Sequence, residues 1–169
     1  MKLYILRHGD AGTSGDPAYS NDDERPLSSK GTSRTETLAR ALRRWDVTFD
    51  VIFSSPLVRA RETAEIVASE LRLKDRLTLT EQLAPSGDVV KLVTEVNAVL
   101  PTPGSVLLVG HEPYLSHLIS RLSTTHGDLA VTLKKGGLCR MDAETLRPER
   151  CAYLEWLLTP GLIDAKRKK

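Results

Sequence analysis

The chain has 169 residues and a mass of 18.7 kDa, which suits one domain that buries about 70% of the surface its unfolded chain exposes. Hydrophobic residues make up 40% and charged residues 27%, a balance that argues against intrinsic disorder. The net charge of +2 includes four positive charges at residues 166–169; subtracting them leaves −2, which argues against a broad basic surface for nucleic acid. We therefore expect a single domain over residues 1–160 and a solvated basic tail at 161–169.

Apolar runs that alternate with amphipathic stretches predict an α/β fold. Strands are expected at residues 2–7, 50–54, 76–80 and 105–110. Helices are expected at residues 28–45, 57–72, 88–100 and 113–124. Further strand-like runs follow at residues 129–133, 137–142 and 152–158 and predict an antiparallel edge. The whole pattern predicts a three-layer α/β/α sandwich with a mostly parallel mixed sheet.

A long irregular stretch from Asp10 to Pro26 separates the first strand from the first helix. Its glycines, prolines and polar residues predict a mobile loop. Because the loop begins directly after His8, it is a candidate lid or substrate-recognition loop, and a plain surface excursion is the alternative. Ser28 or Ser29 is expected to cap the helix that follows.

Two of the predicted strands deliver a histidine at their carboxyl end, the edge at which open α/β sheets bind ligands. Arg7-His8-Gly9 ends the first strand, and Gly110-His111 ends the fourth. The second strand runs into Ser55 and a helix that carries Arg59 near its start. Two guanidinium and two imidazole groups at one edge indicate a phosphate site with a built-in nucleophile.

The chemistry of phosphoryl transfer suggests a role for each of these side chains. Arg7 and Arg59 suit the equatorial oxygens, because a guanidinium group stays charged and can donate two hydrogen bonds together. His8 is the candidate nucleophile, since an imidazole with an ordinary pKa near ~6.5 is largely neutral at pH 7. Gly9 lets the backbone pack closely against that ring. His111 is then expected to donate a hydrogen bond to a phosphoryl oxygen.

The other histidines predict no further chemistry. His117 lies in the middle of a predicted helix and His126 stands beside a loop glycine, so neither follows the strand-end pattern. No third histidine or acidic ligand accompanies His8 and His111 at a suitable spacing, and two nearby arginines would repel a cation. We therefore expect neither a metal nor a cofactor.

Cysteine usage and the start of the chain bear on the cellular setting. Cys139 and Cys151 are too far apart for a metal knuckle and too few for a disulfide framework, which favours a reducing compartment. The apolar run at residues 3–6 is too short for a secretory segment or a membrane span. We expect a cytoplasmic monomer that binds neither membranes nor nucleic acid.

Taken together, the strand-end residues resemble the histidine phosphatase superfamily, which includes phosphoglycerate mutases and histidine acid phosphatases. The resemblance lies in the RHG motif Arg7-His8-Gly9, in Ser55-Pro56 followed by Arg59-Ala60 and Thr63, and in Gly110-His111. The chain is most similar to the SixA-type phosphohistidine phosphatases, and this likeness spans about residues 1–160. It adds Asp10-Ala11 after the RHG motif, Arg25-Pro26-Leu27-Ser28 with Gly31, and Leu83-Ala84-Pro85 with Gly87-Asp88.

The resemblance implies a phosphoglycerate mutase-like fold and a phosphatase that works without a cofactor. It implies that His8 becomes transiently phosphorylated and that Arg7, Arg59 and His111 form the phosphate pocket. Ser55 and Gly9 are then expected to contribute to substrate binding. The implied partner is a phosphohistidine-containing protein of signal transduction, or a small phosphorylated substrate.

Two departures from the relatives leave the proton donor open. Where relatives often have a glutamate before the Leu-x-Pro segment, this chain has Gln82, with Glu81 one residue earlier, and an amide cannot act as a general acid. Histidine acid phosphatases have an aspartate after the second catalytic histidine, and this chain has Glu112. The candidate donors are therefore Glu112, Glu81 and Asp10, and a solvated or capping role is the alternative for each.

The leaving group then discriminates between substrates. An alkoxide released from a phosphomonoester has a conjugate acid whose pKa approaches ~15.7, so a positioned acid contributes about 10²–10⁴-fold. An imidazole with a pKa near ~6.5 leaves with far less help. The sequence therefore predicts a SixA-type phosphohistidine phosphatase that acts through phospho-His8. The alternatives are a small-molecule phosphomonoesterase and a non-catalytic phosphate-binding module.

Overall fold

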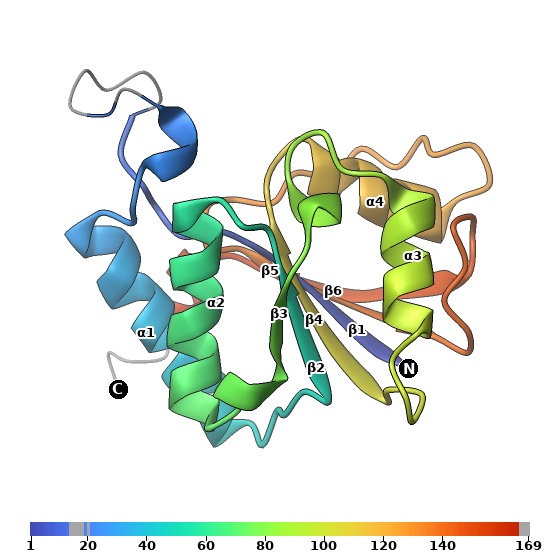
Figure 1. Ribbon diagram of the computed structural model, residues 1–169, viewed down its shortest axis with the longest axis horizontal. Coiled ribbons are helices and arrows are strands. Elements are labelled where there is room, and N and C mark those ends of the chain that lie inside the picture. The colour runs from blue at the N-terminus through green and yellow to red at the C-terminus, as the bar shows by residue number, and fades with distance from the viewer. Residues whose placement is uncertain (14–18, 20, 166–169) are drawn as a thin grey trace.

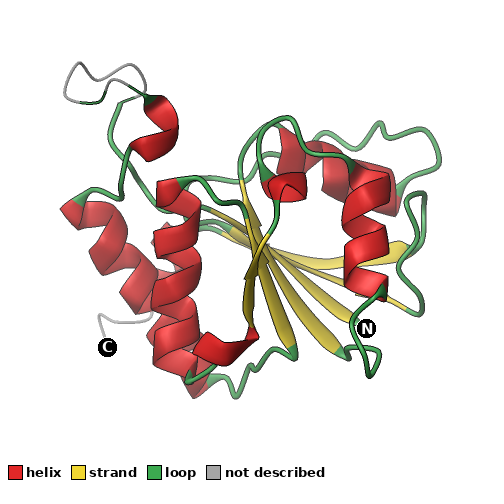
Figure 2. Ribbon diagram, viewed as in Figure 1, coloured by secondary structure: helices red, strands yellow, loops and turns green. Residues whose placement is uncertain are grey.

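A six-stranded sheet lies between two layers of helices in the computed structural model, which describes residues 1–13, 19 and 21–165 (Figures 1 and 2). The strands are β1 (Lys2–Arg7), β2 (Val51–Ser54), β3 (Leu77–Leu79), β4 (Ser105–Gly110), β5 (Leu138–Ala143) and β6 (Ala152–Leu158). The helices are α1 (Ser29–Arg44), α2 (Val58–Leu71), α3 (Val89–Asn97), α4 (Tyr114–Ser123) and α5 (Pro160–Ala165). Short 3₁₀ helices lie in the connections: η1 (Asp22–Glu24), η2 (Lys74–Arg76) and η3 (Glu81–Leu83). The predicted three-layer α/β/α sandwich is confirmed.

The strand order is β3-β2-β4-β1-β5-β6, so the first and fourth strands of the sequence are neighbours. β1, β2, β3 and β4 pair in parallel, and β5 and β6 pair antiparallel at one edge, as the sequence predicted. The register of β1 and β4 sets Arg7 opposite Gly110. Because parallel strands end at the same edge, this register brings the residues that follow them together.

β1 is buried on both faces, which explains its unbroken apolar sequence. Successive side chains of a strand point to opposite faces. Tyr4 and Leu6 therefore join the core beneath α1, α2 and α5, whereas Leu3 and Ile5 join the core beneath α3 and α4. Figure 1 shows these two groups of helices on opposite sides of the sheet.

The helices begin where capping residues allow. Ser28 caps α1, because its Oγ accepts a hydrogen bond from the backbone N–H of Gly31 at 3.0 Å. Asp88 caps α3 through the N–H of Lys91. α3 ends at Asn97, before the predicted residue 100, and Leu100 precedes Pro101, a position that disfavours the helical conformation.

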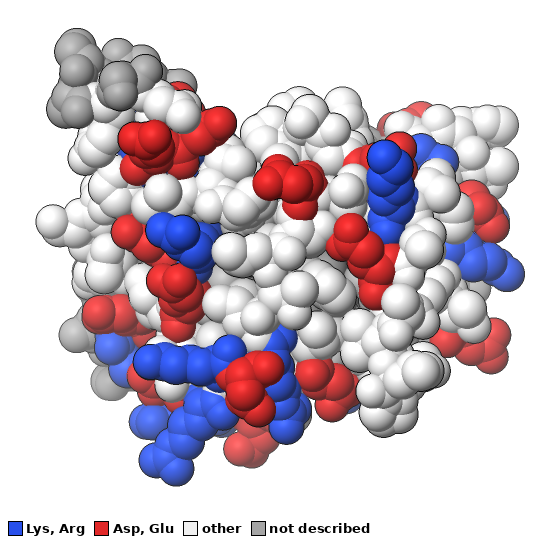
Figure 3. Space-filling model, in the orientation of Figure 1, with Lys and Arg blue, Asp and Glu red and all other residues white. Residues whose placement is uncertain are grey.

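The surface carries both charges, and no described helix is long and apolar enough to cross a membrane. On the face shown in Figure 3, acidic and basic side chains are interspersed, and the basic ones gather mostly toward the lower ends of α1 and α2. This mixture resembles an ordinary hydrated surface rather than a continuous basic stripe.

The strand predicted at residues 129–133 is wrong, because this segment is a loop. Its alternating apolar residues resemble a strand, but its backbone bonds to side chains instead of a neighbouring strand. The N–H of Leu133 donates to Glu112 Oε1 at 2.7 Å, and the carbonyl of Leu133 accepts from Arg7 Nη1 at 2.8 Å. The segment is therefore a support for residues at the end of the sheet.

Two predicted segments lie only partly within the described residues. Residues 14–18 and 20 of the predicted loop at 10–26 lie outside them, and η1 occupies residues 22–24 of the remainder. Residues 166–169 of the basic tail lie outside them as well. Within the segment expected to be tail, α5 runs to residue 165, and Ile163 is buried against the core that also contains Leu38.

The backbone that follows β1 packs unusually closely against the start of α1. A Cβ atom on Gly31 would lie 1.9 Å from the carbonyl oxygen of Asp10, and one on Gly9 would lie 2.7 Å from Thr35 Oγ1. The same Asp10 carbonyl accepts the backbone N–H of Ser28 at 2.9 Å. Only glycine at both positions lets the chain after His8 keep this contact.

We expect Gly31→Ala to lower the free energy of unfolding by about 1–3 kcal/mol, because the added methyl group overlaps backbone that cannot move aside freely. An ordinary glycine-to-alanine change inside a helix raises stability by about 1 kcal/mol. Ser33→Ala, at an exposed position of the same helix, is the control. Urea denaturation measures both variants, and a Gly31→Ala protein as stable as the wild type would contradict the close contact.

Candidate active site

His8 and His111 lie side by side at the carboxyl edge of the sheet. They follow the paired strand ends of β1 and β4, and the N–H of His8 donates to the carbonyl of Gly110 at 3.1 Å. Their ring centroids are 5.0 Å apart, and the rings are inclined by 49°. The side chains are 5% and 2% exposed, so both imidazoles are shielded from bulk water.

The hydrogen bonds of His8 fix which ring nitrogen carries the proton. Nδ1 lies 2.7 Å from the carbonyl oxygen of Gly9, and a carbonyl can only accept, so Nδ1 is the donor. The neutral ring therefore has its lone pair on Nε2. The N–H of Gly136 donates to the carbonyl of His8 at 2.9 Å and holds the backbone in place.

The neutral form of His8 is favoured by its surroundings. Burial lowers the pKa of His8 to about 4; the bond to Gly9 opposes this shift, and the nearby charges of Arg59, Arg7 and Lys135 add to it. The ring is thus a neutral base at pH 7, the form that can attack an electrophile.

His111 is held from the strand next to it in the sheet. Its Nε2 lies 2.9 Å from the hydroxyl of Ser55, which directly follows β2, and the N–H of Ser55 donates to the carbonyl of Val109. Burial lowers the pKa of His111 to about 3, and the charges of His8, Arg59 and Arg7 act in the same direction. Both pKa values are thus lowered by the same two arginines.

The two arginines come from different elements. Arg7 ends β1, and its Nη1 donates to the carbonyl of Leu133. Arg59 lies in the first turn of α2, where Thr63 Oγ1 donates to its carbonyl at 2.7 Å and accepts the N–H of Gly9 at 3.0 Å. Thr63 therefore ties α2 to the backbone beside His8. Burial lowers the pKa of both guanidinium groups.

Buried nitrogen atoms without a hydrogen-bond partner gather at this edge. Among the described residues, Nε of Arg7, Nε of Arg59 and Nδ1 of His111 are such atoms, and the hydroxyl of Tyr114 is the one other case. Buried polar groups are normally satisfied, and leaving one unpaired costs about 1–3 kcal/mol. Two cationic side chains with unused N–H groups next to a neutral imidazole form a site for an anion with several oxygens.

The three carboxylates predicted as candidate proton donors differ in their hydrogen bonds and in their exposure to solvent. The carboxylate of Glu112 accepts hydrogen bonds from the N–H and hydroxyl of Ser116, at 3.1 and 2.6 Å, and from the N–H of Leu133. It therefore binds the first turn of α4 and the loop that holds Arg7, and its oxygens are occupied by these contacts. Glu81 lies in η3 with an exposed side chain.

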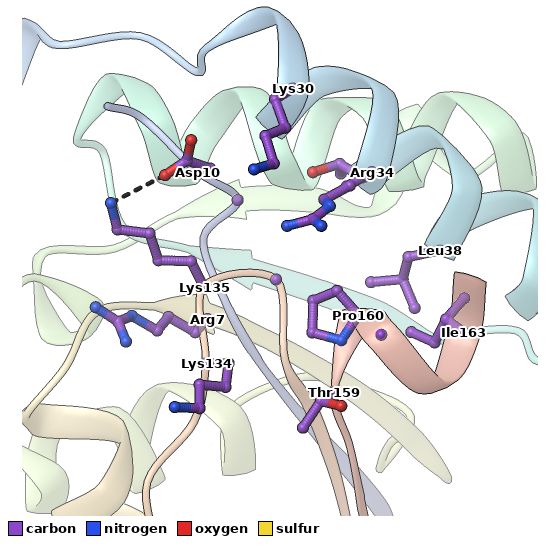
Figure 4. A pocket seen from close by; sticks show the side chains of 14 residues that line it. Arg7, Asp10, Lys30, Arg34, Leu38, Lys134, Lys135, Thr159, Pro160 and Ile163 are labelled. Carbon is purple, nitrogen blue, oxygen red and sulfur yellow. Dashed lines mark hydrogen bonds and ion pairs between the residues drawn. The ribbon is translucent and has the colours of Figure 1, made fainter. Parts of the chain in front are cut away.

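Asp10 pairs with Lys135, whose Nζ lies 3.0 Å from Asp10 Oδ1 (Figure 4). Burial raises the pKa of Asp10, but the hydrogen bonds from Lys135 and Ser28 outweigh it, and the net effect lowers that pKa. A carboxyl group held ionised in this way is a poor proton donor at neutral pH.

Asp22 in η1 contacts the site directly, although its sequence position did not indicate a role. Arg59 Nη1 donates to the backbone carbonyl of Asp22 at 2.7 Å, and Arg59 Nη2 lies 3.5 Å from Asp22 Oδ2. Arg25 holds the same carboxylate through Nε at 2.9 Å and Nη2 at 3.3 Å, and donates to the carbonyl of Ala11. The only sequence signal was an acid three residues before Arg25, a pattern too common to be informative.

Comparison with known proteins agrees with this geometry. The family model of the histidine phosphatase superfamily (branch 1) matches residues 3–84, which include Arg7, His8 and Arg59. The phosphohistidine phosphatase SixA of Escherichia coli (strain K12) is 31% identical over 147 residues, 81% of this chain and 88% of that protein.

Solved structures show the same fold. The protein histidine phosphatase SixA complexed with tungstate superposes with a TM-score of 0.82 at 26% identity, over 96% of this chain and 99% of that one. The α-ribazole phosphatase from Shigella flexneri gives a TM-score of 0.66 at 21% identity, over 95% and 97% of the two chains.

The sequence likeness thus extends over four fifths of the chain, and the likeness of fold over nearly all of it. The chain belongs to the histidine phosphatase superfamily (branch 1) and is a phosphatase similar to SixA.

Proposed function

We propose that this phosphatase hydrolyses phosphohistidine through a covalent phospho-His8 intermediate. The observation that carries the proposal is the state of His8: a buried neutral imidazole, with its Nε2 lone pair available, beside buried nitrogens of Arg7, Arg59 and His111 that lack partners. The likeness to SixA supports the same reaction.

In the first step, Nε2 of His8 forms a bond to phosphorus as the P–N bond of the substrate breaks. The bonding pair goes to the leaving ring, which already carries a proton on its other nitrogen and therefore departs as a neutral imidazole without a proton donor. Arg7, Arg59 and His111 bind the three phosphoryl oxygens, where the negative charge concentrates. In the second step, water attacks the phosphorus, the bond to Nε2 breaks, and inorganic phosphate leaves. Ser55 and Gly9 orient the two imidazoles in this scheme.

The leaving group supports phosphohistidine over a phosphomonoester. The oxygens of Glu112 are occupied by hydrogen bonds from Ser116 and Leu133, and Asp10 is ion-paired with Lys135, so neither carboxylate is available to protonate an alkoxide. An imidazole leaving group needs little such help. A small phosphomonoester is the second candidate substrate, favoured by the fold shared with an α-ribazole phosphatase and by the Asp22 carboxylate beside Arg59.

We further assign Asp22 as an internal anion that competes with the substrate for Arg59. The phosphoryl group needs the guanidinium that Asp22 now contacts through both its carbonyl and its carboxylate. Substrate binding therefore displaces η1 from Arg59. In this proposal η1 covers Arg59 until the substrate binds.

Brief exposure to ³²P-labelled phosphohistidine protein, followed by quenching in alkali, should leave label on His8. His8→Ala should lose the label and reduce turnover by on the order of 10³-fold or more, because the nucleophile is gone. His117→Ala, at an exposed position of α4, is the matched control and should keep both. Label on another residue, or full turnover by His8→Ala, would refute the intermediate.

The imidazole of His8 should stay neutral down to about pH 4, as a ¹⁵N-imidazole NMR titration can measure. The lowered pKa values of His8 and His111 also make the unfolded protein bind more protons below about pH 6.5. The free energy of unfolding should therefore fall as the pH drops from 7 to 5, by roughly 1–2 kcal/mol per histidine. A His8→Asn/His111→Asn protein should show a flatter profile. Titration of both rings near pH 6.5 would contradict the lowered pKa values.

Asp22→Asn should lower KM for phosphohistidine protein about 3- to 10-fold with little change in kcat, since a competing charge worth about 1 kcal/mol is removed from Arg59. The inhibition constant of tungstate should fall in parallel. Glu24→Gln makes the same charge change at an exposed position of η1 and is the control. A large loss of kcat confined to phosphomonoesters would instead identify Asp22 as a proton donor.

A further inference from the structure

The hydroxyl of Ser55 has two hydrogen-bond partners at the end of β2. Its Oγ lies 2.9 Å from Nε2 of His111, and it accepts a hydrogen bond from the backbone N–H of Leu57 at 3.3 Å. Ser55 is 0% exposed and His111 is 2% exposed. Because bulk water does not reach this pair, each of their polar hydrogens needs an acceptor within the protein or on a ligand.

The direction of the bond between Ser55 and His111 follows from their other contacts. The Leu57 N–H already uses one lone pair of Ser55 Oγ, and Nε2 of His111 is the one acceptor within the described chain that the Ser55 O–H contacts. If Nε2 donated instead, a buried O–H would have no acceptor, which is costly. Ser55 is therefore the donor, and Nε2 of His111 is a lone pair. The neutral ring carries its proton on Nδ1.

This tautomer determines what His111 offers to a ligand. Nδ1 of His111, Nε of Arg7 and Nε of Arg59 are buried and lack a hydrogen-bond partner among residues 1–13, 19 and 21–165. With the proton on Nδ1, all three nitrogens are N–H donors. With the proton on Nε2, Nδ1 would be a lone pair that repels an oxyanion. The three equatorial oxygens of a phosphoryl group are matched by the donor form.

His8 and His111 then have the same tautomer but leave opposite nitrogens available. Nδ1 of His8 donates to the carbonyl of Gly9, so its Nε2 is a lone pair. Nε2 of His111 accepts from Ser55, so its Nδ1 is a donor. Of two rings whose centroids are 5.0 Å apart, one is thus set up as a nucleophile and the other as a hydrogen-bond donor.

We propose that Ser55 is a positioning residue that fixes the Nδ1–H tautomer of His111 and thereby makes this ring a donor to a phosphoryl oxygen of the substrate. Ser55 acts through the ring, because its own hydroxyl is engaged by His111 and Leu57. The inference rests on the proposed function for the identity of the anion, whereas the tautomer is a property of the free protein.

Long-range ¹H–¹⁵N NMR on protein with ¹⁵N-labelled histidine measures the tautomer, because protonated and unprotonated ring nitrogens differ widely in chemical shift. At pH 7 the wild-type His111 ring should carry its proton on Nδ1 alone. Ser55→Ala should let Nε2 carry the proton in a measurable share of molecules. Ser54→Ala is the matched control, since it removes an adjacent buried hydroxyl that donates to a backbone carbonyl, and it should leave the tautomer unchanged.

Tungstate binding measures the consequence for an oxyanion. Ser55→Ala should raise the dissociation constant of tungstate about tenfold, the effect of weakening one hydrogen bond to a charged group, and Ser54→Ala should stay within twofold of wild type. An asparagine amide places its N–H donors near the position of Nδ1, whereas a glutamine amide places them near Nε2. His111→Asn should therefore bind tungstate more tightly than His111→Gln.

Three results would each overturn the inference: a proton on Nε2 of wild-type His111, an unchanged tautomer in Ser55→Ala, or tighter tungstate binding by His111→Gln than by His111→Asn. None of these measurements requires turnover. Absence of label on His8 would refute the proposed reaction and leave the tautomer of His111 as it is. A proton on Nε2 of His111 would leave a phospho-His8 intermediate standing.

Discussion

The parallel pairing of β1 with β4 is the interaction on which the rest of the structure depends. It sets Arg7 opposite Gly110 and thereby places His8 next to His111, although about a hundred residues separate them in the chain. The pairing is strongly specified, because β1 buries alternate side chains in two different cores. A slip of one residue would exchange those faces and also separate the two imidazoles.

Burial then determines the chemistry of the pair. Two imidazoles removed from water and flanked by guanidinium groups stay neutral, and the bond from Nδ1 of His8 to Gly9 leaves the other nitrogen available for attack. The cationic groups are thus matched to an incoming anion rather than to protonated histidine. Asp22 supplies a negative charge to Arg59 within the protein itself. Arg59 in turn holds η1 in place through the carbonyl and the carboxylate of Asp22.

The supporting contacts explain how the arginines are oriented. Glu112 holds the N–H of Leu133, and the carbonyl of Leu133 holds Arg7, so the residue after His111 positions the residue before His8. Thr63 links Arg59 to the backbone of Gly9 in a similar way, because its hydroxyl donates to the carbonyl of Arg59 and accepts the N–H of Gly9. The turn that follows the Leu133 loop carries Lys135, which pairs with Asp10 beside the end of β1.

The α/β architecture and the strand-end positions of His8 and His111 could be predicted from the order of residues, because hydrophobic periodicity and the ends of strands are local properties. The antiparallel edge of β5 and β6 was predicted in the same way. The loop at residues 129–133, the supporting role of Glu112 and the contact of Asp22 with Arg59 became visible in the folded chain alone. Each of these depends on a side chain bonding to backbone or charge distant in the chain, and a one-dimensional pattern carries no record of such partners.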